Sequence, residues 1–150
     1  MFQPSREEVR RFFCDAWARH RAGAAVSALE RMAIACMLEH PEYHALLQDV
    51  DAALERDFPV EAGRENPFLH LSMHLSLEEQ ASIDQPPGVR ALLLDLEQRL
   101  GGRHGAAHEA MECLGEVVWS AQRGTLPGDM DSINRAYIDC LQCRLGKNRS

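Results

Sequence analysis

The sequence has 150 residues, of which 45% are hydrophobic and 26% charged, and acidic residues outnumber basic ones 23 to 16, for a formal net charge of -7. This length fits one domain with a substantial core. The acidic balance excludes broad binding to nucleic acid or to anionic membranes, which requires a basic face, so we expect no nucleic-acid and no membrane partner.

Apolar residues recur at helical spacing from the start of the chain, which predicts a first helix over residues 7–20. A second helix is expected to open at Ser27. Ser27 and Glu30 have the residue types and spacing of a capping box, in which each side chain bonds the other residue's backbone N–H.

Pro41 interrupts the next segment. The residue before a proline is pushed away from helical geometry, so His40 should end one helix or cap the next. A short helix is then expected over residues 41–47, followed by another over 49–56 and a turn-rich stretch through 59–63.

The second half of the chain predicts longer helices. Asn66 followed by Pro67 is typical of a helix start, with an Asn N-cap and proline at the first helical position. No segment alternates with a period of two, so strands should be few or absent. The predicted fold class is all-α, a compact single-domain helical bundle of about six or seven helices over residues 1–150, with its later helices at 67–83, 89–100, 103–123 and from about 130 to 143.

Six of the seven histidines form three pairs in which the two residues are four apart, and residues at that spacing share a face of a helix. Two of the pairs are followed by carboxylates at the same spacing. Imidazole and carboxylate together suit divalent transition metals such as zinc, iron or manganese. The pairs are His40/His44, His70/His74 and His104/His108, and the carboxylates are Glu78, Glu112 and, one turn further, Glu116.

The pair at His70 and His74 is the strongest candidate, because its stripe is embedded in apolar surface, where ionisable groups are costly unless they are paired or bind a metal. If the two later histidine helices pack side by side, their stripes converge. The predicted metal ligands are therefore His70, His74, Glu78, His108 and Glu112, with His104 or Glu116 peripheral. Pro41 makes His40/His44 the weakest pair, and its role is left open, as is that of Cys140 and Cys143.

These residues do not identify a reaction, and the catalytic residues are unknown. No Glu-x-x-His motif of the ferritin-like di-iron bundles is present, and His108–Glu112 resembles the zincin motif with glutamate in place of the second histidine. We expect a metal-binding helical bundle, which would suit a metal-dependent enzyme acting on a small molecule. The alternative is a non-catalytic interaction or structural module, for example a homodimer, in which the histidines order helix packing.

The sequence shows no pattern typical of a secretory signal or of a membrane-spanning segment. The chain lacks the basic start, apolar run and small-residue cleavage site of a secretory signal, and no apolar stretch approaches the ~20 residues that span a bilayer. Its five cysteines are an odd number without a dense framework. We expect reduced cysteines and a cytoplasmic protein.

Three stretches carry a resemblance to a known family: the opening MFQPSREEVRRFF, then ENPFLHLSMHLSLEEQASIDQPPG at residues 65–88, and RHGAAHEAMECLGEVVW at residues 103–119. Together they resemble a family of small bacterial proteins, the domain of unknown function 1841, over nearly the whole chain. The resemblance implies a bacterial, single-domain cytosolic protein. It implies no activity, substrate or ligand, so it transfers no functional residue.

Overall fold

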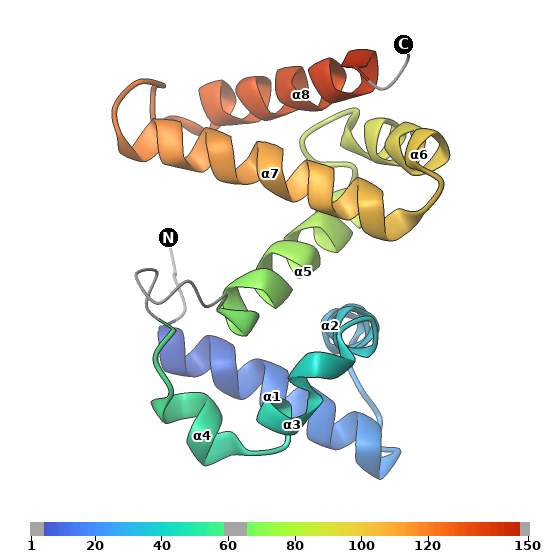
Figure 1. Ribbon diagram of the computed structural model, residues 1–150, viewed down its shortest axis with the longest axis vertical. Helices are drawn as coiled ribbons and strands as arrows, with labels where there is room; N and C mark the ends of the chain where they lie inside the picture. The colour runs from blue at the N-terminus through green and yellow to red at the C-terminus, as the bar shows by residue number, and fades with distance from the viewer. Residues whose placement is uncertain (1–4, 59–65, 148–150) are drawn as a thin grey trace. The chain divides into compact units, whose positions relative to one another are not determined.

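The computed structural model describes residues 5–58 and 66–147, and in these ranges every regular element is a helix (Figure 1). The predicted all-α class is confirmed. The described residues form eight α-helices and one 3-10 helix, rather than six or seven, because the short segments between residues 41 and 55 fold as separate pieces. None of the described helices has both the length and the apolar character needed to cross a membrane. The turn-rich stretch predicted at 59–63 lies outside the described residues.

The chain divides into two compact units, with the boundary between Leu75 and Ser76. That boundary falls inside α5, whose first part belongs to the first unit and whose last part belongs to the second. The expectation of a single domain over residues 1–150 stays a prediction.

The first unit contains α1 (Arg6–Ala22), α2 (Ala28–Leu38), the 3-10 helix η1 (Pro41–Tyr43), α3 (His44–Leu47), α4 (Val50–Glu55) and the beginning of α5 (Pro67–Ile83). The predicted capping box is present: Ser27 Oγ accepts from the Glu30 N–H, and the Glu30 carboxylate accepts from the Ser27 N–H. Helices α2 and α4 both pack against α1 (Figure 1).

The core of the first unit collects apolar side chains from all of these helices. Phe13 and Trp17, one turn apart on α1, lie in one buried cluster with Met37 from α2 and Leu47 from α3. Helix α5 contributes Leu71, which is completely buried. The same core therefore fixes the end of α2 and the first turns of α5, the two segments that carry the histidines considered below.

The second unit contains the end of α5 together with α6 (Val89–Leu100), α7 (Arg103–Gln122) and α8 (Met130–Lys147). Helix α6 packs against both α7 and α8, and α7 runs alongside α8 (Figure 1). Gly101 ends α6 with a left-handed backbone (φ 74°), a conformation that glycine adopts without steric cost.

A disulfide between Cys113 and Cys140 joins α7 to α8, with the two Cα atoms 5.7 Å apart. The expectation that all cysteines are reduced is therefore wrong for this pair. This pairing could not be predicted from the sequence. The two cysteines are 27 residues apart, and whether they meet depends on how their helices pack. Cys143, one turn after Cys140, stays outside the disulfide and is exposed.

Candidate metal centre

Helix α5 places His70 and His74 one turn apart on the same face. Asn66 starts this helix by accepting the N–H groups of Phe68 and Leu69 on its side-chain oxygen, at 3.0 and 3.3 Å. His74 is 4% exposed and His70 is half-buried. Their Nε2 atoms lie 3.1 Å apart.

His40 reaches the same place from the end of α2. Its backbone is not helical (φ -127°, ψ 68°), as the following Pro41 predicts. The ring is 3% exposed and stacks on Tyr43, with the centroids 5.3 Å apart and the planes 1° from parallel. His40 Nδ1 lies 2.8 Å from the Cys36 carbonyl oxygen at the end of α2.

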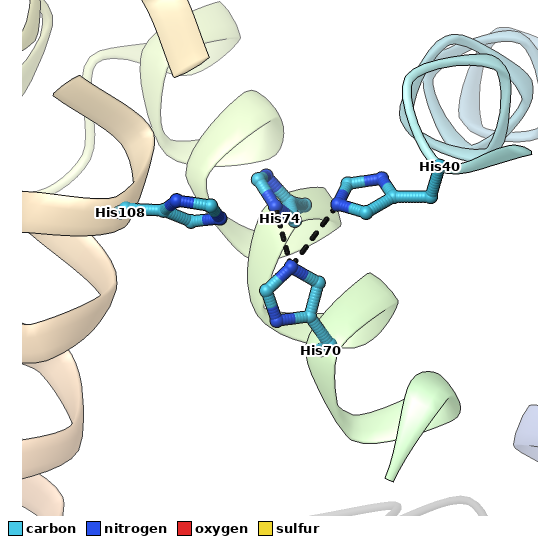
Figure 2. Close-up of side chains that lie close together, drawn as sticks. All are labelled: His40, His70, His74 and His108. Atoms are coloured by element: carbon cyan, nitrogen blue, oxygen red, sulfur yellow. Dashed lines mark hydrogen bonds between the residues drawn. The ribbon is translucent and has the colours of Figure 1, made fainter. Parts of the chain in front are cut away.

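The three rings converge through their Nε2 atoms. His70 Nε2 lies 3.1 Å from His40 Nε2 and 3.1 Å from His74 Nε2. The candidate ligand atoms of the three residues all lie within 4.8 Å of one another. Figure 2 shows these three rings pointing toward one another from the end of α2 and from α5.

The position of the protons explains why this arrangement suits a cation. A carbonyl oxygen only accepts, so the proton of a neutral His40 sits on Nδ1 and its Nε2 presents a lone pair. His70 Nε2 offers either one N–H or one lone pair, and it cannot form well-directed bonds to two ring nitrogens at once. A metal ion can accept a lone pair from each of the three Nε2 atoms at once.

His44, the other member of the first pair, has a different environment. Its Nε2–H donates to the Met37 carbonyl oxygen at 2.7 Å, and its ring stacks on Trp17 with the centroids 4.2 Å apart. His40 and His44 thus cap two successive carbonyls at the end of α2. The two histidines of this pair therefore differ in role: His40 joins the cluster, and His44 supports the helix end that holds it.

The other predicted ligands lie in the second unit. Glu78 forms an ion pair with Arg103, and Glu112 accepts a hydrogen bond from Arg144 at 2.6 Å. Arg144 also pairs with Glu109 and Glu116, the latter one of the residues expected to be peripheral. An arginine partner competes with a metal for a carboxylate, so these ion pairs reduce the availability of Glu78 and Glu112. Their ligand role stays a prediction.

The second histidine pair lies at the start of α7. The rings of His104 and His108 are edge to face, with the centroids 4.2 Å apart. His104 is exposed and His108 is half-buried. The assignment of His108 to the same metal as His74 also stays a prediction.

Sequence reasoning missed one residue of the cluster, His40. The four-residue spacing to His44 drew attention to it, but that spacing has meaning only on a helix, and Pro41 removes His40 from one. The place of His40 at the C-terminus of a helix could have indicated its role. A histidine there can donate Nδ1–H to the carbonyl groups that have no partner within the helix. Such a ring has its Nε2 directed away from the backbone.

Comparison with known proteins gives a family and no activity. No curated protein and no solved structure matches the chain. The family model described as "Domain of unknown function (DUF1841)" matches residues 5–143, which includes all three clustered histidines. The chain belongs to the DUF1841 family, as its two histidine-bearing stretches indicate.

Proposed function

We propose that the protein binds one divalent transition metal ion, zinc, iron or manganese, through Nε2 of His40, His70 and His74. The observation that carries the proposal is the convergence of the three Nε2 atoms, with His70 Nε2 at 3.1 Å from each of the other two. Ring nitrogens bind these metals at about 2.0–2.1 Å, which separates two tetrahedral ligands by about 3.3 Å. The spacing in the cluster is close to that value.

The surroundings of His40 also favour a ligand role. Metal-bound histidines usually donate their second ring N–H to a carbonyl or carboxylate, which fixes the tautomer and orients the ring. His40 Nδ1 has this partner in the Cys36 carbonyl oxygen, and Tyr43 stacks on the ring. The orientation is therefore set before any metal binds.

Three protein ligands leave a coordination position open, as in catalytic zinc sites, where it is taken by water or substrate. A metal bound in this way polarises an oxygen or lowers the pKa of its water, which suits an enzyme that acts on a small molecule. We extend the proposal to this class of activity. His108, or a carboxylate from Glu78 or Glu112, remains a candidate for the fourth position.

Elemental analysis of the protein purified without a histidine tag, combined with melting curves, tests the proposal. We expect about one equivalent of metal and a melting temperature that falls when chelator is added. A metal that binds only the folded state stabilises it by about 2.7 kcal/mol at a hundred times its dissociation constant. The variant His74→Ala should hold no metal and ignore chelator, whereas the exposed His20→Ala should behave as wild type.

The structural alternative gives a different result. If the histidines only order helix packing, His74→Ala still loses stability, by about 1–3 kcal/mol, through a cavity and an unpaired neighbour. Chelator would then change neither protein. A wild-type protein that has been incubated with zinc, iron and manganese and melts identically with and without chelator overturns the metal proposal.

A further inference from the structure

Arg10 is a buried cation in the first unit, with 2% of its surface exposed. Its Nη1 donates to the carbonyl oxygens of Ala53 and Arg56, at 2.8 and 2.7 Å, and so caps the C-terminal end of α4. Its guanidinium also lies over the rings of Phe58 and Phe68, at 5.6 and 5.1 Å from the centroids. These contacts hold the group in place, but none of them supplies a negative charge.

Within residues 5–58 and 66–147, most of the donor capacity of Arg10 is unused. Both of its hydrogen bonds start from Nη1, and in the described part of the chain Nε and Nη2 have no acceptor. Burial, and after it the charge of Arg6, lowers the pKa of Arg10. Asp57, whose charge acts in the opposite direction, is paired with Arg6. A buried cation that has no carboxylate bonded to it is costly, which favours an anion beside it.

Arg6, one turn earlier on α1, adds a second positive charge at the same point. Its Nη2 donates to the Arg56 carbonyl oxygen at 2.7 Å and to Asp57 Oδ1 at 2.8 Å. The guanidinium groups of Arg6 and Arg10 therefore share one carbonyl oxygen. Asp57 is the carboxylate that Arg6 pairs with, so two cations meet one anion among the described residues here.

These groups line a pocket that is open to solvent. A cavity of about 380 Å³ is lined by Arg6, Arg10, Asp57, Phe58 and Asn66. A second one of about 220 Å³ shares both arginines and Asn66, and it adds the apolar side chains of Val9, Phe68 and Leu69. The larger of the two volumes falls within the range of pockets that hold small organic molecules. The lining does not include the three clustered histidines.

We propose that this cavity is a binding site for a small organic anion that carries a carboxylate or phosphate group on an apolar, aromatic body. Arg10 and Arg6 donate charge-assisted hydrogen bonds to the anionic oxygens, and Phe58 and Phe68 contact the apolar body. The amide nitrogen of Asn66 is a further donor, because the oxygen of that side chain already accepts the first N–H groups of α5. The site is independent of the proposed metal.

Calorimetric titration of the full chain at constant ionic strength tests this site with phenyl phosphate, benzoate and inorganic phosphate. We expect saturable binding of one equivalent, with phenyl phosphate or benzoate bound more tightly than inorganic phosphate. The preferred headgroup separates phosphate esters from carboxylates as the natural ligand. The variant Arg6→Gln should weaken binding about tenfold or more, as expected for the loss of a charge-assisted hydrogen bond. The neighbouring surface variant Arg11→Gln is the matched control and should bind as wild type.

Asn66→Asp separates ligand binding from folding. Aspartate caps a helix as well as asparagine does, so α5 should persist, and the new carboxylate should neutralise the arginines. We expect an unchanged or higher melting temperature together with loss of anion binding. Absence of saturable binding for all three probes overturns the proposal, as does Arg6→Gln or Asn66→Asp binding with wild-type affinity. Equal affinity for inorganic phosphate and phenyl phosphate overturns the aromatic part of it.

Discussion

At the scale of single residues, the two nitrogens of one imidazole decide what a histidine can do. His40 uses Nδ1 to cap a helix and directs Nε2 toward His70, whereas His44 uses its Nε2 on the Met37 carbonyl. Two histidines four residues apart thus have different roles. Spacing in the sequence does not distinguish them, because the choice depends on which carbonyl lies within reach of each ring.

The first prediction separates the three ligands from the histidines around them. His40→Ala and His70→Ala should each weaken zinc affinity by at least about tenfold, since each removes one metal–nitrogen bond. His44→Ala should lower stability, because it exposes a helix end, while the protein still binds one equivalent of zinc. Competition with a chromophoric chelator measures the affinities. Wild-type affinity in His40→Ala would contradict the assignment.

The second prediction concerns two cysteines of different reactivity. Cys14 is 1% exposed, and burial raises the pKa of its thiol to about 11. The thiolate is the reactive form, so Cys14 should resist alkylation near pH 8, whereas the exposed Cys143 should react within minutes. Mass spectrometry after timed iodoacetamide treatment locates the label, and the unfolded protein provides the control. Equal labelling of both cysteines in the native protein would show that Cys14 is accessible.

At the scale of helices, the caps predicted from the sequence are present, and their contribution to the free energy of unfolding can be measured. Ser27→Ala removes the side-chain oxygen that accepts the Glu30 N–H at 3.1 Å, and it should cost about 1 kcal/mol of unfolding free energy. Ser27→Asp keeps an acceptor and should cost much less. Urea denaturation followed by circular dichroism measures both variants. A loss of the same size in Ser27→Asp would indicate that the cap oxygen is not responsible.

The disulfide between α7 and α8 carries the fourth prediction. It closes a loop of 27 residues, so its removal should destabilise the second unit by about 3–4 kcal/mol in the chain-entropy account. A reducing agent and the variant Cys113→Ala should both lower the denaturation midpoint. Cys143→Ser, which leaves the disulfide intact, is the matched control. A wild-type midpoint that does not respond to reduction would exclude a stabilising disulfide.

At the scale of the whole molecule, the histidine spacing in the sequence predicts one metal site with ligands from both units. The stripe on α7 predicts that His108 binds the same metal as His74. X-ray absorption of the zinc-loaded protein counts the histidine ligands, and His108→Ala should remove one of them and weaken binding about tenfold or more. An unchanged absorption spectrum in His108→Ala would restrict the site to the first unit.

The helices could be predicted from the sequence because their causes are local. Apolar spacing, the Ser27–Glu30 box, the Asn66–Pro67 start and the glycines after Leu100 act within one or two turns, and the structure has a helix boundary at each. His70 and His74 could also be predicted as neighbours, since a single helix sets their distance. These features depend on residues at most four or five positions apart.

Long-range contacts decided the rest. The sequence contains His40, Cys113 and Arg10, but it does not say that His40 meets a helix 30 residues later, that Cys113 pairs with Cys140, or that Arg10 is buried against the end of α4. Each of these contacts arises when apolar faces of different helices pack, and the hydrophobic driving force that packs them is not directional. Local spacing therefore determined the helices and two of the three clustered histidines, and only tertiary packing brought in the third ring and the cationic cavity.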